Sequence, residues 1–249
     1  MEVHTHSSRT SGTKKNWTEY LWEFLMLFLA VFCGFLAENE REHFVEHQRE
    51  KQYIRSLISD VKTDTANITL WMASFSNRQK SCDTVLDNFD SFSKNYSIKT
   101  GKNYFSVISG FADFIYTDRT MQQLKNSGGM RLIRNIGATD SIIAYDAAVR
   151  DILIEESGIS LYWDQLNDLT NKMLSYRKIS SEFKTKTAGE IEKQKINFWI
   201  NQDEREFEHL YNLLYNYRNT VAGYNMQLSQ LKNRGGRLVD FLQKEYNIK

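Results

Sequence analysis

The strongest hydrophobic pattern in the chain is a seven-residue repeat that begins at Ile54. Apolar side chains recur at alternating spacings of four and three residues, which keeps them on one face of a helix. Nine of the eleven positions of this first stripe are apolar, and Thr65 and Gln79 are the exceptions. The stripe consists of Ile54, Ile58, Val61, Thr65, Ile68, Met72, Phe75, Gln79, Cys82, Leu86 and Phe89, and Leu57, Trp71 and Val85 widen it. A face this wide is typical of a helical bundle, because a two-stranded coiled coil needs a narrower one.

Two more stripes of the same kind follow. The second runs from residue 142 to 173, and Asp140 or Thr139 offers its N-cap. The third runs from residue 196 to 242 and is interrupted by Asp203. Polar residues at such positions often set helix register or partner number. At 1.5 Å per residue, helices of about 35 to 50 residues would extend roughly 50 to 75 Å.

Glycines mark two places where the helical pattern changes. Gly235 and Gly236 lie inside the third stripe and indicate either a break or a close helix contact. In the connection between the first two stripes, residues 103–113 can form a short helix, and Thr117 or Asp118 can cap another. Gly128 and Gly129 then provide a helix stop with a left-handed residue. We expect these two short helices to pack across one end of the bundle.

A run of fourteen residues without a charge, FLMLFLAVFCGFLA, occupies positions 24–37. If Glu23 is tolerated near the edge, residues 17–37 make a 21-residue segment, which is enough to cross a bilayer. Its N-terminal side carries the aromatic and basic residues typical of a cytoplasmic membrane boundary. These residues are Trp17, Tyr20, Trp22, Lys14 and Lys15.

Three interpretations of this segment compete: an uncleaved anchor, a cleaved secretory signal and a buried helix of a soluble protein. Phe35 and Leu36 place bulky residues where a cleavage site needs small ones, and Val31 and Phe32 before Cys33 do not fit a lipoprotein site. An uncleaved anchor is therefore favoured. Acidic residues dominate the C-terminal flank from position 38, so we expect the N-terminus inside and the rest of the chain outside.

These patterns predict an all-α protein in which an N-terminal transmembrane helix continues into an elongated antiparallel bundle of three long helices, with short helices in the first connection. Nothing between residues 38 and 53 would stop the first helix. The expected divisions are a tail over residues 1–16, a transmembrane anchor over 17–37 and an extracytoplasmic helical bundle over 38–249. The expected location is the inner (cytoplasmic) membrane, crossed once, with the C-terminal domain in the periplasm.

Composition supports a folded helical protein and narrows its partners. The chain has 249 residues, 41% of them hydrophobic, and 32 basic against 31 acidic side chains. This balance disfavours disorder and nucleic-acid binding. The absence of proline allows long unbroken helices. Cys33 and Cys82 lie 49 positions apart, which indicates neither a disulfide framework nor a thiolate metal site.

Several separated segments share a further pattern. Glu23 opens the apolar run, LISDVKTD occupies positions 57–64, LKNSGGMRLIRN occupies positions 124–135, and the final amphipathic helix ends over residues 238–246. These segments resemble a family of membrane-anchored proteins of unknown function that is common in the Bacteroidetes, and positions 124–135 are similar to its Leu-Lys-x-Ser-Gly-x-x-x-Leu-Ile pattern. At positions 38–42 the sequence ENERE replaces the family's usual Asn-Asn-Trp-Asn-Glu. The resemblance implies a single-pass anchor and an extracytoplasmic helical domain, without known catalytic or binding residues.

Two short motifs suggest chemistry. His43, Glu46 and His47 have the His-x-x-Glu-His spacing of inverted zinc peptidases, which places two imidazoles on one helix face. No third ligand is evident downstream, so a polar juxtamembrane face is the preferred interpretation. His4 and His6 lie in the N-terminal tail, where a metal contact would mean little.

The other motif is Gly128-Gly129, which resembles an anion cradle but lacks the preceding strand and the Lys-Ser/Thr signature. A helix stop is the preferred interpretation there. Lys125, Arg131 and Arg134 can form a small basic patch beside it.

Tyrosines are concentrated on the third stripe. Tyr217 and Tyr224 occupy core positions, whereas Tyr211 and Tyr215 flank the stripe and could face a partner. We find no nucleophile set, phosphate loop or cofactor fingerprint in the sequence, so no catalytic, cofactor-binding or metal residues are assigned and no cofactor is expected.

We therefore expect not an enzyme but a membrane-anchored structural or interaction protein. Its expected partners are the lipid bilayer and either an envelope protein or a second copy, with no nucleic acid. The alternative is an extracytoplasmic ligand sensor, because bundles host ligands between helices. About 16 residues precede the anchor, so such a sensor would need a separate output protein.

Overall fold

The computed structural model describes residues 16–110 and 114–248, and its regular structure over these ranges is helical. The elements are α1 (Trp17–Asp87), α2 (Phe89–Lys94), α3 (Ile98–Ile108), α4 (Arg119–Asn126), the 3₁₀ helix η1 (Gly129–Leu132), α5 (Ile136–Met173), α6 (Tyr176–Thr185), α7 (Ala188–Lys193) and α8 (Glu204–Glu245). The chain divides into two compact units, residues 1–50 and 51–249, and α1 contributes to both. Each unit is described separately.

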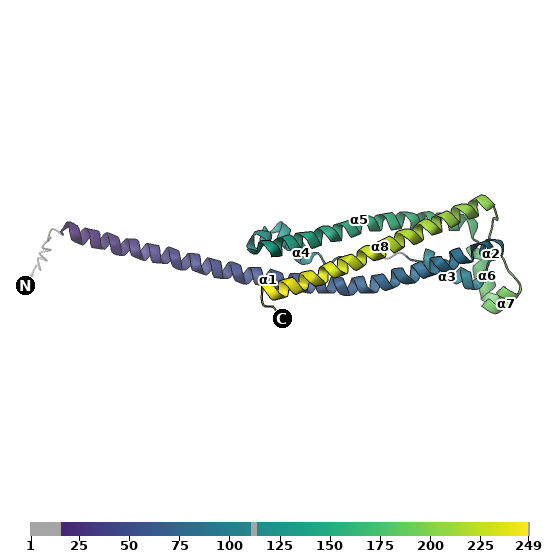
Figure 1. Ribbon diagram of the computed structural model, residues 1–249, viewed down its shortest axis with the longest axis horizontal. Helices are drawn as coiled ribbons and strands as arrows, with labels where there is room; N and C mark the ends of the chain where they lie inside the picture. Colours follow the sequence, from purple (N-terminus) through teal and green to yellow (C-terminus); the bar gives the residue numbers. More distant parts are fainter. Residues whose placement is uncertain (1–15, 111–113, 249) are drawn as a thin grey trace, which may run out of the picture. The chain divides into compact units, whose positions relative to one another are not determined.

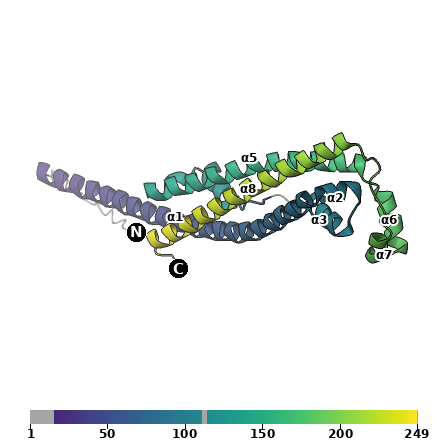
Figure 2. The same ribbon diagram turned by 45° about the vertical axis from the view of Figure 1, so that its right-hand side comes forward.

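Unit 2, residues 51–249, is built on three long helices: α1 from residue 51 onward, α5 and α8 (Figures 1 and 2). At one end of this bundle, Trp199 just before α8 donates a hydrogen bond from Nε1 to the Phe92 carbonyl at 2.9 Å and pairs with Leu174 just after α5. Near the other end, Gly235 of α8 lies against Thr65 of α1 and Tyr145 of α5. The prediction of a three-long-helix bundle is confirmed; α8 runs antiparallel to both α1 and α5, which run parallel to each other.

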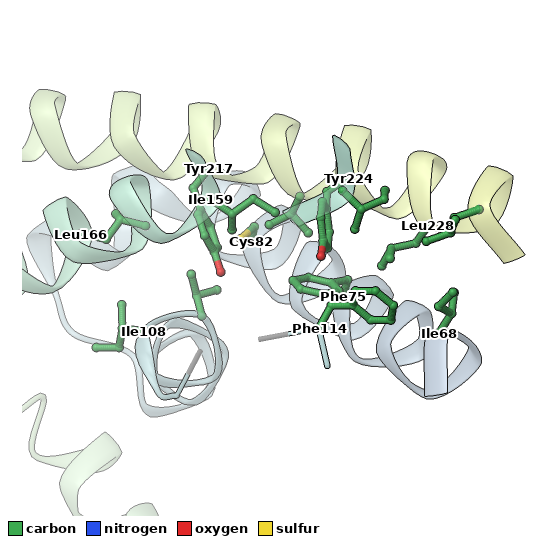
Figure 3. Close-up of a cluster of buried hydrophobic side chains, with 14 of the residues drawn as sticks. Ile68, Phe75, Cys82, Ile108, Phe114, Ile159, Leu166, Tyr217, Tyr224 and Leu228 are labelled. Atoms are coloured by element: carbon green, nitrogen blue, oxygen red, sulfur yellow. The ribbon is translucent and has the colours of Figure 1, made fainter. Parts of the chain in front are cut away.

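The predicted stripes form the core of unit 2. Ile68 and Cys82 of α1, Ile159 of α5, and Leu228 of α8 are all fully buried, and Figure 3 shows such side chains converging between the helices. Burying aliphatic and aromatic side chains stabilises the bundle by about 1.5 to 3 kcal/mol each. The three stripes therefore explain which faces of the long helices meet.

The short helices of the first connection differ from the expectation in their bounds and places. α3 begins at Ile98, where the Ser97 side chain caps it, and ends at Ile108; the remainder of the expected 103–113 helix runs into residues 111–113, outside the described residues. α3 contacts α5 and α7, whereas α4 is held to the early part of α5 by the pairing of Lys125 with Asp146 (Figure 1). The expectation that both pack across one end was wrong, because parallel α1 and α5 require the connection to return along the bundle.

Two predicted helix starts are also corrected. α5 begins at Ile136 because the side chain of Asn135, not that of Asp140 or Thr139, accepts a hydrogen bond from the Ala138 amide at 2.9 Å. α8 begins at Glu204, and Asp203 is its N-cap, accepting from the Arg205 amide at 2.9 Å. Asp203 is therefore a cap and not a polar residue of the helix face. The stripe positions before it belong to a non-helical segment.

An aromatic cluster closes the end of the bundle where α8 begins. Trp199 is buried and meets Phe92 and Phe207 edge to face, with ring centroids 5.1 Å apart in both pairs. Tyr96 and Tyr104 complete the cluster around the same indole ring. Edge-to-face aromatic pairs add about 0.5 to 1.5 kcal/mol each beyond their area burial. This cluster fixes the segment before α8, which helical periodicity alone does not describe.

Gly235 and Gly236 lie within the unbroken helix α8. A Cβ built on Gly235 would lie 2.8 Å from Thr65 Cγ2, whereas a Cβ on Gly236 meets nothing within 4 Å. Of the two sequence alternatives, a break or a close helix contact, the structure confirms the close contact, and it assigns that contact to Gly235.

Candidate functional site

The apolar segment of residues 17–37 forms the first part of α1 and is exposed within this chain. Met26, Leu27 and Val31 retain 71%, 69% and 74% of their accessible surface, so the segment does not lie in the core of the described structure. Among the described residues, α1 is the one helix long and apolar enough to cross a membrane, and it lies near the N-terminus. Helices of this kind are found both in single membrane spans and in signal sequences.

Unit 2 contains a set of four buried carboxylates. Asp60 and Asp64 belong to α1, and Asp146 and Glu156 belong to α5; each is at most 7% exposed. All four accept hydrogen bonds from residues 114–125, the segment that returns between α3 and α5. Burying a carboxylate is costly unless donors surround it, so this arrangement fixes the returning segment against two long helices.

Asp60 caps α4 from outside that helix. Its Oδ2 accepts hydrogen bonds from the Thr120 amide at 3.2 Å and from the Thr120 hydroxyl, and its Oδ1 accepts from Arg119 Nε at 2.7 Å. Asp118, the residue at the N-cap position, makes no side-chain capping bond. A carboxylate at this position satisfies an unpaired helix amide and lies at the positive end of the helix dipole.

Asp64 lies one turn further along α1, facing the same segment. It accepts from the Thr117 amide at 2.9 Å and from the Tyr145 hydroxyl at 3.3 Å. Burial raises the pKa of Asp64, and hydrogen bonds from Thr117 and Tyr145 oppose that shift. The negative charge of Asp60 also raises the pKa.

The two carboxylates of α5 complete the set. Asp146 pairs with Lys125 of α4, with Nζ–oxygen distances of 2.8 and 2.9 Å, and with Arg150 on its own helix. Glu156 accepts a hydrogen bond from the Phe114 amide at 2.6 Å. Because these oxygens are engaged by amides, hydroxyls and cations, the set supports positioning of the chain; it is not arranged to bind a metal ion. Among the described residues, no group of three His, Cys, Asp or Glu is placed to hold one.

The buried Asp64 gives unit 2 a predicted pH dependence. Its folded-state pKa is raised, so protonation is easier in the folded than in the unfolded chain. The stabilising effect of protonation is therefore full below the unfolded pKa of about 3.9 and is lost as the pH rises through the folded-state pKa. We expect the free energy of unfolding of the wild type, relative to Asp64→Asn, to fall as the pH rises from 3 to 7.

Denaturant titrations of the full-length protein in detergent at several pH values would measure this difference. The titratable groups around Asp64 are Asp60, Tyr116 and Tyr145, and Arg119 is paired with Asp60. The exposed Asp168 provides a control, since an Asp168→Asn variant should follow the wild type at every pH. A wild-type advantage over Asp64→Asn that grows with pH would contradict the assignment.

The His-x-x-Glu-His motif predicted from the sequence lies on α1. His43 and His47 are exposed on α1, and His47 Nδ1 lies 3.2 Å from Glu50 Oε2. The geometry brings no third ligand to them among the described residues. His4 and His6 lie outside the described residues.

The helix stop predicted at Gly128-Gly129 is confirmed. α4 ends at Asn126, and Gly128 adopts a left-handed backbone with φ of +66°. Lys125 does not belong to an open basic patch, because its ammonium group is paired with Asp146. Arg131 and Arg134 are exposed. The returning segment thus combines a turn that needs glycine with a lysine that holds it to α5.

The core positions predicted for Tyr217 and Tyr224 are confirmed, since both are buried (Figure 3). Tyr211 is half-buried against Phe89, with ring centroids 5.1 Å apart, and Tyr215 is 52% exposed. Thr65 and Gln79 are half-buried on the bundle face of α1. The sequence patterns do not identify the four buried carboxylates as a set. Asp60, Asp64 and Lys125 do lie in the segments 57–64 and 124–135, which carry the family resemblance.

Comparisons with protein-family models, curated proteins and solved structures give no match to this chain.

Proposed function

We propose that this protein is a single-pass membrane-anchored interaction protein. Residues 17–37 cross the inner (cytoplasmic) membrane, and the bundle of unit 2 lies on the periplasmic side and presents a surface to an envelope protein or to a second copy. The observation that carries the proposal is the exposure of the charge-free run, in which Leu27 and Phe35 keep 69% and 67% of their surface. Exposed apolar surface costs about 25 cal/mol per Å² in water and little in lipid, where a helix also satisfies its own backbone.

The flanks of the segment support the proposed orientation. Lys14 and Lys15 precede it, and acidic residues at positions 38, 40 and 42 follow it. Basic residues are retained on the cytoplasmic side of a membrane, so the N-terminus lies inside.

The outer face of α5 supports a role in protein contact. Ile143, Ile154 and Leu161 are 48%, 68% and 57% exposed, and their spacings of 11 and 7 residues place them on one face of the helix. Aligned exposed apolar side chains are typical of a surface that another protein covers. The resemblance to the Bacteroidetes family agrees with an anchored helical domain and adds no further activity.

The two cysteines provide a test of the anchor. Cys33 lies in the apolar segment, and Cys82 is fully buried in unit 2, where burial raises the pKa of the thiol to about 12. In washed membranes without detergent, we expect a water-soluble maleimide to label neither thiol, because one lies in lipid and the other in the core. Fragmentation of the alkylated protein by mass spectrometry would locate any label.

The same measurement separates an anchor from a cleaved signal. After denaturation in SDS, an intact anchor gives two reactive thiols, whereas cleavage of a signal after residue 37 removes Cys33 and leaves one. Labelling of Cys33 in intact membranes, or recovery of the protein in the soluble fraction, would overturn the proposal of a membrane span.

Crosslinking in intact membranes tests the interaction role. We expect affinity purification of the tagged full-length chain after crosslinking to recover a recurrent partner or a fixed oligomer. Monodisperse monomers without a recurrent partner would contradict the interaction role and leave the anchor result unchanged.

A further inference from the structure

A groove of about 820 Å³ is lined by residues 86–94, where α1 passes into α2, and by residues at the start of α8. Its aromatic lining is formed by Phe89, Phe207 and Tyr211. The Phe89 ring meets those of Tyr211 and Phe207 edge to face, with centroids 5.1 and 6.3 Å apart, and Phe207 meets the buried Trp199 at 5.1 Å. The floor of the groove is therefore held by the aromatic cluster that closes this end of the bundle.

Carboxylates surround that floor. Glu204 and Glu208 share one face of α8 with Phe207 and Tyr211, because their spacings of three and four residues bring them together. Asp87 and Asp90 flank Phe89 at the junction of α1 and α2. All four acidic residues are exposed, and within the described structure none of their side chains forms an ion pair or hydrogen bond. Lys94 is the one cationic residue that lines the groove.

The spacing of these four carboxylates indicates whether a metal ion or a larger cationic ligand fits the groove. Among the described residues, no three carboxylates or other metal ligands are close enough together to hold a metal ion. Four dispersed carboxylates instead match several cationic groups carried on one extended ligand. Aromatic side chains beside them accept guanidinium or ammonium groups through cation–π contacts and cover their aliphatic stems. Arginine suits such a site best, because its guanidinium both stacks on rings and pairs with carboxylates.

We infer that this acidic, aromatic-floored groove binds a basic segment of a partner protein, with an arginine side chain over the half-buried Tyr211 and arginines paired with Glu204 and Glu208. The inference rests on the proposed interaction role and adds a second contact surface, separate from the outer face of α5, together with the chemistry of the partner that it binds. It also gives Tyr211, which flanks the third stripe, a direct contact with that partner.

Fluorescence anisotropy with fluorescein-labelled octa-arginine tests the inference on the purified full-length protein in non-ionic detergent at about 0.1 M salt. We expect the double variant Glu204→Gln/Glu208→Gln to weaken binding at least tenfold and Tyr211→Leu to weaken it at least threefold. The matched control is Asp151→Asn/Glu155→Gln on α5, which removes two exposed acids with the same spacing. It should change binding less than twofold.

Three outcomes would overturn the inference. The first is that octa-arginine fails to bind. The second is that both double variants weaken binding equally, which would indicate an effect of net charge alone. The third is that spermine displaces the peptide at an equal concentration of positive charge, which would indicate a polyamine site. Circular dichroism of each variant would confirm that the bundle is intact. None of these results bears on whether crosslinking in membranes recovers a partner, so the groove and the interaction role fail separately.

Discussion

Replacing Asp60 with alanine is expected to lower the free energy of unfolding of unit 2 by about 2 to 3 kcal/mol. The substitution removes the acceptor of both the Thr120 amide and the Thr120 hydroxyl, at a position where Thr120 is only 1% exposed. Water cannot replace the lost acceptor without entering the core, so two donors lose their partner at the start of α4. Chemical denaturation of the full-length protein in detergent, followed by far-UV circular dichroism, would measure the change.

Two companion variants show which part of the Asp60 contact matters. Arg119→Ala should cost less than about 1 kcal/mol, because the Arg119 side chain is 69% exposed and its ion pair with Asp60 is screened by solvent. Asp168→Ala, at an exposed site in α5, should change stability by less than about 0.5 kcal/mol. If Arg119→Ala proved as damaging as Asp60→Ala, the ion pair and not the capping of α4 would be the main contribution.

The parts of the fold that follow from local periodicity could be predicted. Spacing alone predicts the first stripe and the part of α5 from residue 142 onward, since burial of one face imposes a repeat that the sequence displays directly. Gly128 was identified as a helix stop because a left-handed residue after a helix favours glycine. Each of these features depends on residues close together in the chain.

The remaining features depend on contacts between residues far apart in the sequence. Asp60 and Thr120 are separated by 60 positions, and no periodicity records that one caps the other's helix. The segment between α5 and α8 is fixed by Trp199, whose indole donates to the Phe92 carbonyl 107 positions away. The parallel course of α1 and α5 requires a returning connection, and a contact that holds this connection, from the Thr117 amide to Asp64, joins residues 53 positions apart. For the same reason, the groove lined by Phe89 and Tyr211 has no signature in the sequence, because it joins residues 86–94 to residues 202–211.

Gly235→Ala and Gly236→Ala are expected to have opposite effects on stability, although the glycines are adjacent in the same helix. Alanine is favoured over glycine inside a helix by about 1 kcal/mol, and Gly236 has open space around its Cβ position, so Gly236→Ala should stabilise by about 0.5 to 1 kcal/mol. At Gly235 the added Cβ would lie 2.8 Å from Thr65 Cγ2 and 3.2 Å from Tyr145 Cε2. Overpacking of this kind costs about 1 to 3 kcal/mol, so Gly235→Ala should be destabilising overall.

A second substitution tests whether the collision with Thr65 causes that loss. Thr65→Ser removes the methyl group that the new Cβ would meet and keeps the hydroxyl that donates to the Lys62 carbonyl at 2.9 Å. In the Gly235→Ala background, Thr65→Ser should therefore recover part of the stability, whereas in the Gly236→Ala background it should not. Free energies of unfolding of the wild type, Gly235→Ala, Thr65→Ser and the Gly235→Ala/Thr65→Ser double variant, measured in one detergent, give the coupling energy, and the same cycle with Gly236→Ala is the control. A coupling near zero would mean that α1 and α8 do not approach each other as closely at Gly235 as the contact requires, and the arrangement of the bundle there would need to be revised.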